Sequence, residues 1–285
     1  MLRSLNASEF DACINLAYEL SQDLTRSGYP TYCDGIKTRE DLIARVRKAL
    51  DRPDEDVLLF VEDGRTEGLI AFEHPEEERY LHPFIFNIRR KTGKALAEFV
   101  DYCRERWPGF ELDLGFPVEN VDAVSWLEEA GVPCIERSRN YQLFLDGYTP
   151  LPEDPAVERV GADNFQRFAA IHRRVEGEMY WNCERIQKSL DDWLIFVTGE
   201  GNSARELLLT NWGGDHQEIF SLGSADGQYR EGPCRALLTA GLNALKARGV
   251  KYLTCFIEDG AKDGEALTAL GFQLVGRSTA YRIQL

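Results

Sequence analysis

A short basic segment in the first half of the chain is the first candidate for chemistry. Arg89, Arg90 and Lys91 follow a predicted strand at residues 84–86, and Gly93 lies at the start of an amphipathic helix. The first N–H groups of a helix point outward with partial positive charge, and a glycine lets the backbone approach a ligand closely. This pattern indicates a phosphate or diphosphate site; the alternative is a solvated basic turn.

Residues that could accept a proton lie just before this segment. Glu73 closes a predicted strand, His74 follows it, and His82 precedes the apolar residues 84–86. An amine that attacks an acyl carbon must lose a proton, and a carboxylate or imidazole beside that carbon is the usual acceptor. Glu73 and His74 are therefore candidate catalytic bases. The alternatives are a solvated carboxylate at a strand end and a histidine that is exposed or merely packs.

The elements that would position these residues occur twice. Residues 130–143 and 270–283 share the pattern Arg-Ser-x-x-Tyr at a constant offset of 140, and Gly93 and Gly232 each precede an amphipathic helix. Chance similarity is the alternative, but several blocks recur in the same order, which is typical of an internal duplication.

The duplication predicts two domains, at residues 1–147 and 157–285. The linker between them, 148–156, is rich in proline, which breaks regular structure. In the first half, two helices are followed by a hairpin, a helix, a strand, a helix and a final strand. The elements after the two helices are expected at residues 57–61 with 68–73, 95–107, 110–114, 121–130 and 134–145. In the second half, a helix stripe at 238–245 precedes a strand at 252–257, so both halves are α/β units of one design.

Two motifs in the first copy resemble those of a known family. Arg90-Lys91-Thr92-Gly93-Lys94-Ala95 matches Arg/Gln-x-x-Gly-x-Gly/Ala, the loop with which GNAT-family N-acetyltransferases bind the pyrophosphate of acyl-CoA. Asn120-x-x-Ala123, followed by Gly131, resembles the second signature of that family. The likeness extends over essentially the whole chain as two tandem copies, an arrangement similar to that of mycothiol synthase.

The resemblance implies a fold and a reaction. Each copy would be an α/β (α+β) domain with a mixed, mainly antiparallel sheet flanked by helices. The protein would be an acyl-CoA-dependent N-acetyltransferase that moves an acetyl group from acetyl-CoA, or another acyl group, to a small amine by direct attack in a ternary complex. A main-chain N–H would polarise the acyl carbonyl.

The resemblance also implies contacts for the first copy. The cofactor-binding residues would be Phe84, Ile85 and Phe86 along the pantetheine arm, Arg90, Lys91, Thr92, Gly93, Lys94 and Ala95 at the diphosphate, and Asn120 at the lower arm. Tyr29 and Tyr32 lie in a segment that the second copy lacks, roughly residues 25–37, where the family caps its acceptor pocket. They are the expected substrate-binding residues.

The sequence departs from the family pattern in both copies. Leu127 and Leu267 stand where the family often has the tyrosine that protonates the leaving thiolate, and Gly260 replaces the asparagine in copy two. Pro233 removes an N–H donor from the second phosphate loop and Glu231 adds negative charge. We therefore expect copy one to bind acyl-CoA and copy two to be a degenerate, structural half. The alternatives are a non-catalytic acyl-CoA-binding or interaction module, and activity in copy two.

Composition limits the partners. The chain has 285 residues, and 33 Lys plus Arg against 48 Asp plus Glu give a net charge of −15. This charge argues against a nucleic-acid clamp or an anionic-membrane binder and suits a cationic or amine ligand. Seven scattered cysteines suggest neither a disulfide framework nor a metal site, and no run approaches the roughly 18 apolar residues of a membrane helix. We expect a cytoplasmic protein, either a monomer with two fused copies or a homodimer.

Overall fold

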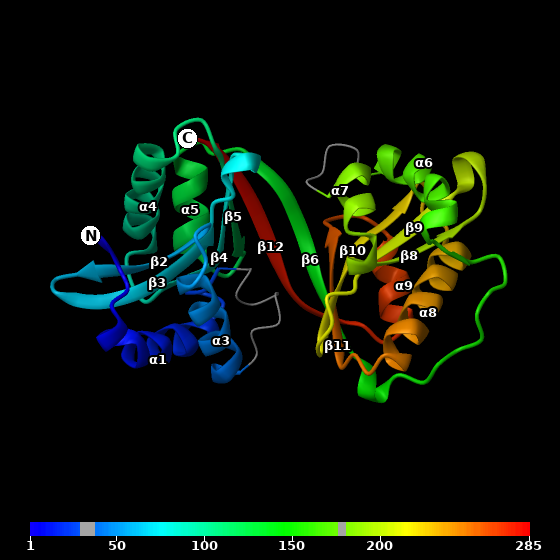
Figure 1. Cartoon of the computed structure of the whole chain (residues 1–285), viewed down its shortest axis with the longest axis horizontal. Coiled ribbons are helices and arrows are strands. Elements are labelled where there is room, and N and C mark those ends of the chain that lie inside the picture. The colour runs from blue at the N-terminus through cyan, green and yellow to red at the C-terminus, as the bar shows by residue number, and fades with distance from the viewer. Residues whose placement is uncertain (29–37, 176–180) are drawn as a thin grey trace. The chain divides into compact units, whose positions relative to one another are not determined.

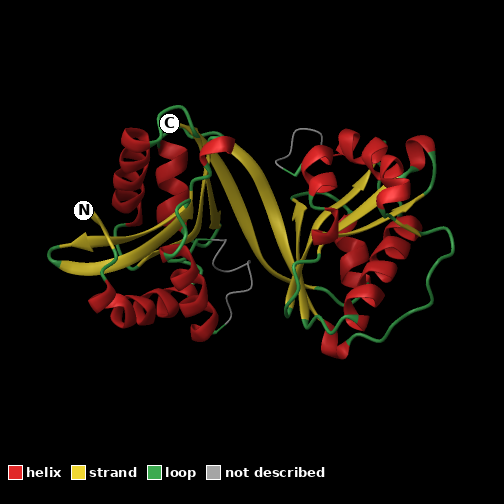
Figure 2. Cartoon of the chain, viewed as in Figure 1, coloured by secondary structure: helices red, strands yellow, loops and turns green. Residues whose placement is uncertain are grey.

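The computed structural model describes residues 1–28, 38–175 and 181–285. It divides into two compact units. Unit 1 comprises Met1–Ser138 and Arg277–Leu285, and unit 2 comprises Arg139–Gly276. Both contain helices and strands in a mixed α+β arrangement, as Figure 2 shows. In the described part of the chain, no helix combines the length and apolar character needed to cross a membrane.

Unit 1 is built on a mixed sheet with strand order β1-β2-β3-β4-β5-β12. Neighbouring strands are antiparallel except β4 and β5, which run parallel. The strands are β1 (Leu2–Ser4), β2 (Glu55–Glu62), β3 (Arg65–Glu73), β4 (Tyr80–Ile88), β5 (Glu111–Pro117) and β12 (Gln273–Gln284).

Helices cover both faces of this sheet, as Figure 1 shows. One face packs against α1 (Phe10–Ser21) and α3 (Arg39–Leu50), and the other packs against α4 (Thr92–Arg106) and α5 (Val121–Glu129). The strands are apolar on both sides because both faces are covered. Ala71 belongs to the core beneath α1 and α3, and its neighbour Phe72 belongs to the core beneath α4 and α5.

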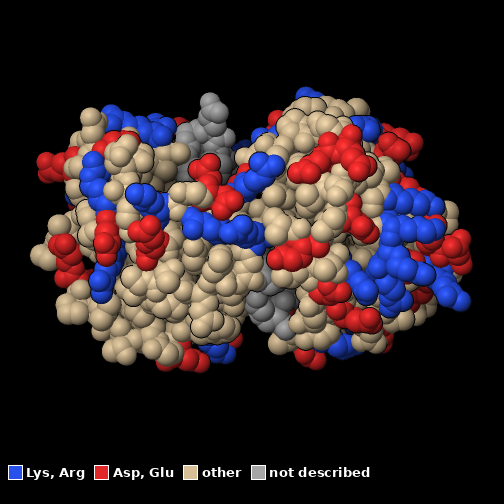
Figure 3. All heavy atoms as spheres, turned by 180° about the vertical axis from the view of Figure 1, so that it is seen from behind, with Lys and Arg blue, Asp and Glu red and all other residues tan. Residues whose placement is uncertain are grey.

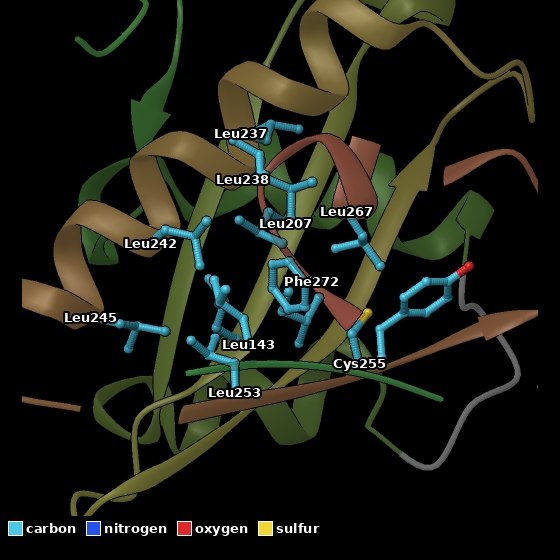
Figure 4. Packing of buried hydrophobic residues seen from close by; sticks show 14 of the residues in the cluster. Leu143, Leu207, Leu237, Leu238, Leu242, Leu245, Leu253, Cys255, Leu267 and Phe272 are labelled. Atoms are coloured by element: carbon cyan, nitrogen blue, oxygen red, sulfur yellow. The ribbon is translucent and has the colours of Figure 1, made fainter. Parts of the chain in front are cut away.

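Unit 2 repeats this plan with strand order β6-β11-β10-β9-β8-β7. The strands are β6 (Cys134–Phe144), β7 (Glu158–Arg159), β8 (Trp193–Thr198), β9 (Arg205–Thr210), β10 (His216–Ser224) and β11 (Tyr252–Glu258). The helices are α6 (Phe165–Val175), α7 (Cys183–Lys188), α8 (Glu231–Ala247) and α9 (Asp263–Ala269). Leucines of α8 and α9 pack with Leu207 of β9 and Leu253 of β11 in one core (Figure 4).

The last strand of each half belongs mainly to the sheet of the other half. Residues Ser278 to Gln284 of β12 pair with β5 along its whole length, and Tyr281 is fully buried in the core of unit 1. Correspondingly, β6 lies beside β11, and Tyr141 is buried in the core of unit 2. The compact units therefore differ from the continuous halves expected at 1–147 and 157–285. The repeated Arg-Ser-x-x-Tyr pattern makes the two strands interchangeable in sequence, and this explains why sequence alone could not reveal the exchange.

The two units share an irregularity at the same place, which supports the duplication. In unit 1 the pairing of β4 with β3 shifts so that Phe84 is an extra residue, and in unit 2 the pairing of β10 with β9 shifts at Phe220. Such a β-bulge redirects the backbone and leaves a residue outside the ladder. The bulges align the units: each residue from Phe84 to Ile88 corresponds to the residue 136 positions later.

Candidate functional site

The parallel strands of unit 1 separate soon after they meet. The described residues of β4 and β5 pair at two positions, Tyr80 with Glu111 and Leu81 with Leu112. Beyond them, Phe84, Ile85 and Phe86 continue along β3 but not along β5. Strands β4 and β5 therefore diverge after Leu81.

A segment of the chain itself lies in this separation. The N–H of Ile88 donates a hydrogen bond to the carbonyl oxygen of Arg26, at 2.9 Å. A Cβ added to Gly28 would lie 3.2 Å from the Cβ of Phe86 on β4 and 3.6 Å from the carbonyl oxygen of Gly115 on β5. Residues 26–28, which we call the internal plug, thus contact both diverging strands.

Asn120, expected to contact the pantetheine arm, contacts the internal plug. Its side chain is fully buried, and Nδ2 donates to the carbonyl oxygen of Ser27 at 3.2 Å. Its Oδ1 caps α5 by accepting from the N–H of Ala123 at 3.3 Å. The Asn120 side chain, which was expected to bind the cofactor, therefore forms hydrogen bonds within the protein.

The basic side chains of the predicted phosphate loop are also paired. Arg90 forms an ion pair with Glu67, and both Lys91 and Lys94 contact Glu62. The hydrogen bonds from the two lysines lower the pKa of Glu62 to about 2, so this carboxylate stays ionised at neutral pH. Much of the positive charge that would attract a diphosphate is balanced by these carboxylates.

Gly93 also has a role in helix packing, which the sequence did not indicate. A Cβ at this position would lie 3.0 Å from the Cδ1 of Trp126 on α5, so the glycine permits close contact between α4 and α5. In the described part of the chain, no side chain caps the start of α4, where Lys91 has a φ of 61°. The N–H of Ala95 donates to the carbonyl oxygen of Lys91 at 3.0 Å, so the backbone donors that remain at this corner are those of Thr92, Gly93 and Lys94.

The two predicted bases lie on opposite faces of the sheet. Glu73 pairs across the strands with His82, whose Nδ1 lies 3.8 Å from Oε1 of the carboxylate. Burial raises the pKa of Glu73, but the interaction with His82 and nearby positive charges outweigh it and lower the pKa overall. His74 is buried against Trp107, with ring centroids 4.6 Å apart, and its Nε2 lies 3.4 Å from Asp56. One amine substrate therefore cannot contact both Glu73 and His74.

The predicted substrate-binding residues Tyr29 and Tyr32 lie outside the described residues. Within the described ranges, no group of three or more His, Cys, Asp or Glu side chains is placed to hold a metal ion.

Unit 2 has a corresponding separation. Strands β10 and β11 pair in parallel from His216 with Tyr252 to Ile219 with Cys255, and the described pairing ends where the bulge at Phe220 begins. The backbone of β10 beyond the bulge therefore has the position that residues 84–88 have in unit 1.

Arg205 of β9 and Tyr229 lie together at the turn between β10 and α8. Arg205 is 1% exposed; its Nη1 donates to the carbonyl oxygen of Gln228 at 3.1 Å and its Nη2 to Asp263 at 2.7 Å. Its Nε and the hydroxyl of Tyr229 are buried, and among the described residues neither has a hydrogen-bond partner. Unsatisfied buried donors are costly, so an anion at this turn would be stabilised. Pro233 still removes one backbone donor from α8.

A further polar cluster was missed by sequence analysis. Glu206 on β9 is completely buried and contacts His172 of α6 and Ser221 of β10. One signal was available: Glu206 stands in a strand whose following residues are Leu207, Leu208 and Leu209, where a carboxylate needs a partner.

Comparison with known proteins supports this fold. No family model matches the chain. A GCN5-related N-acetyltransferase from Sphaerobacter thermophilus is similar over 100% of this chain and 95% of its own, with a TM-score of 0.68 and 15% identity. A putative acetyltransferase from Pyrococcus horikoshii covers 100% of this chain and 89% of its own, with a TM-score of 0.57 and 12% identity. A tandem GNAT protein from the clavulanic acid biosynthesis pathway covers 100% and 98%, with a TM-score of 0.55 and 13% identity. The chain therefore has the fold of the GNAT N-acetyltransferases. The specific likeness to mycothiol synthase is not tested by these structures.

Curated sequences give a different, partial likeness. The large subunit of exodeoxyribonuclease 7 from Streptococcus thermophilus is 26% identical over 172 residues, which are 57% of this chain and 39% of that protein. The corresponding subunit from Streptococcus pyogenes is 28% identical over 127 residues, 41% of this chain and 28% of its own. The matched stretch spans less than two fifths of either relative, whereas the acetyltransferase structures cover the chain from end to end. On the face shown in Figure 3, basic side chains are interspersed with acidic ones.

Proposed function

We propose that the protein is an acyl-CoA-dependent N-acetyltransferase that transfers an acetyl group to a small amine by direct attack in a ternary complex. The observation that supports the proposal is the diverging parallel strand pair with a β-bulge, which occurs in both units. Strands that separate leave backbone groups on their facing edges, and such groups can hold an extended amide-bearing arm in the way a neighbouring strand would.

The two units differ in how well their residues would receive acetyl-CoA. In unit 1 the internal plug takes the N–H of Ile88 and the side chain of Asn120. The described arrangement of unit 1 therefore does not fit the pantetheine arm. In unit 2 the unpartnered Nε of Arg205 and hydroxyl of Tyr229 fit the diphosphate end of such a ligand.

The expected reaction conserves atoms without a further reactant. The nitrogen of a neutral amine forms a bond to the acetyl carbon, the carbon–sulfur bond breaks, and the thiolate leaves. The proton lost by the nitrogen is finally taken up by the sulfur, giving an N-acetylated amine and free coenzyme A. The protein must orient the amine, accept its proton and stabilise the negative charge on the carbonyl oxygen.

A second candidate is a non-catalytic acyl-CoA-binding or interaction module. Two observations favour it: Leu127 and Leu267 are buried where the family often has a tyrosine, and the internal plug fills unit 1. A module of this kind would bind acetyl-CoA without consuming it.

Release of free thiol from acetyl-CoA separates the two candidates. The full-length protein would be assayed with pools of polyamines, amino acids and aminoglycosides, and acetyl-CoA binding would be measured separately by calorimetry. We expect amine-dependent release above the hydrolysis background. Tight binding without release would support the binding module, and the absence of both would rule out both functions.

A further inference from the structure

The polar cluster of unit 2 joins three side chains that are far apart in the sequence. Nδ1 of His172 lies 2.6 Å from Oε1 of Glu206, and the hydroxyl of Ser221 donates to the same oxygen at 3.0 Å. All three side chains are buried. Each comes from a different element, α6, β9 and β10, so the cluster is held by the fold of unit 2.

The hydrogen bonds determine the proton count of this cluster. Nε2 of His172 lies 2.9 Å from the carbonyl oxygen of Trp181, which can only accept, so Nε2 carries a proton. The short contact between Nδ1 and Oε1 requires one more proton, shared by the histidine and the glutamate. The other carboxylate oxygen, Oε2 of Glu206, is buried and has no hydrogen-bond partner among the described residues. Oε2 can therefore accept one further hydrogen bond or one proton.

Unit 1 shows that the fold does not require this cluster. The register at the bulges places Glu206 at the position of Leu69 and Ser221 at that of Ile85. The matching burial of α1 and α6 places His172 at the position of Ala17. Those three residues of unit 1 are apolar and fully buried in one core. Apolar residues fill the equivalent positions in unit 1. The stability of the fold alone therefore does not explain why unit 2 has a buried glutamate and histidine there.

The cluster also lies where the strands of unit 2 separate. Ser221 directly follows the bulge at Phe220 and lies two positions past Ile219, the last residue of β10 with a described partner on β11. The point of divergence is the part of the fold nearest the reacting carbonyl under the proposed function. Burial, the largest effect, raises the pKa of Glu206, while the hydrogen bond from His172 opposes it. A carboxylate of this kind is a better proton acceptor near neutral pH than an ordinary glutamate.

We propose that unit 2 is the site of acyl transfer and that Glu206, supported by His172 and Ser221, binds and deprotonates the amine acceptor. The proposal rests on the proposed function and specifies its site. Oε2 of Glu206 accepts a hydrogen bond from the amine and takes its proton as the carbon–nitrogen bond forms. The proton then passes to the departing thiolate, which restores Glu206 to its starting state. The net charge of −15 favours the approach of a cationic amine, which releases one proton to solvent before its neutral nitrogen attacks the acetyl carbon.

The test compares amine-dependent thiol release by the full-length wild type and by Glu206→Gln. The glutamine retains the size of the side chain and cannot accept the proton. We expect kcat/KM to fall by about 100-fold or more, the range typical of a lost general base. A matched control is Thr210→Val on β9, the strand of Glu206, which removes the buried hydrogen bonds of the hydroxyl with Gln217 and with the N–H of Glu218 on β10. The control should leave kcat/KM within about threefold of the wild type, because the hydroxyl of Thr210 is uncharged and does not contact His172, Glu206 or Ser221.

A second variant separates a catalytic role from a folding defect. The combination His172→Ala, Glu206→Leu and Ser221→Ile installs the residues of unit 1. We expect it to unfold cooperatively at or above the wild-type Tm and to have lost activity. Wild-type rates in Glu206→Gln, or a large loss in Glu73→Gln with none in Glu206→Gln, would overturn the proposal while leaving acyl transfer intact. A wild type that releases no thiol with any amine would instead refute the proposed function.

Discussion

Corresponding residues of the two units have different surroundings, and chemistry at this scale cannot be carried from one copy to the other. Gly93 and Gly232 both lie near the start of the helix that follows the bulged strand. At Gly93 a side chain would meet Trp126, whereas at Gly232 nothing lies within 4 Å of an added Cβ. A glycine that resembles a phosphate-loop residue therefore also serves helix packing in unit 1.

The paired substitutions Gly93→Ala and Gly232→Ala test this difference. We expect Gly93→Ala to lower the free energy of unfolding by about 1 kcal/mol, because the methyl group presses on Trp126. Gly232→Ala should be neutral or raise it by about 0.5 kcal/mol, since alanine favours a helix. Urea denaturation measures both. Equal effects of the two changes would show that contact with Trp126 is unimportant.

The pH dependence of the reaction should report Glu206. Its folded-state pKa is raised by burial above the ordinary 4.5, so the proton-accepting form is lost as pH falls through that raised value. We expect kcat/KM of the wild type to have an acidic limb above pH 4.5, and the residual activity of Glu206→Gln to lack that limb. An identical limb in both proteins would assign it to another group, such as the amine itself. Among the residues that the structure describes, the other ionisable side chains near Glu206 are His172 from α6 and Cys183 from α7, while β8 places Val197 opposite it.

At the scale of elements, two contacts within unit 1 join segments that are far apart in the sequence. The C-terminal residues Arg277–Leu285 complete the sheet of unit 1, and the internal plug fills the separation of β4 and β5. Helices, the hairpin of β2 and β3, and the strand before the phosphate loop could all be predicted, because local periodicity and turn residues determine them. The strand exchange and the plug depend on long-range contacts that no local pattern encodes.

Fragments of unit 1 test the strand exchange. A fragment of residues 1–147 lacks β12, which supplies the buried Tyr281 and Ile283 and all seven described pairs with β5. We expect this fragment to show no cooperative thermal unfolding by circular dichroism. Residues 1–138 joined by a glycine-serine linker to 277–285 should unfold cooperatively. Cooperative unfolding of the 1–147 fragment would contradict the exchange.

Hydrogen exchange at Ile88 tests the internal plug. Its N–H is bonded to Arg26, so we expect slow exchange that saturating acetyl-CoA leaves unchanged. Gly28→Val should speed the exchange, because the larger side chain would press on Phe86 and Gly115. Gly147→Val, at a glycine with nothing within 4 Å of an added Cβ, is the control and should have no effect. Fast exchange at Ile88 in the wild type would show that the plug is not seated.

At the scale of the whole molecule, the sequence motifs and our proposal assign the acetyl-CoA site to different units. Motif comparison favours unit 1, because Gly93 and Asn120 match the family pattern and Pro233 and Gly260 do not. Our proposal instead places acyl transfer in unit 2, where Arg205, Tyr229 and Glu206 have buried polar atoms with no hydrogen-bond partner among the described residues. The fold was predictable because two copies repeat one pattern. The site was not, because its polar residues lie on three separate elements and match no motif.

The most direct measurement is a crystal structure of the full-length protein with acetyl-CoA. We expect the coenzyme between β10 and β11, with its diphosphate beside Arg205 and Tyr229, and residues 26–28 still in contact with Ile88 and Asn120. Coenzyme seated between β4 and β5, with those residues displaced and unit 2 empty, would contradict the assignment of acyl transfer to unit 2.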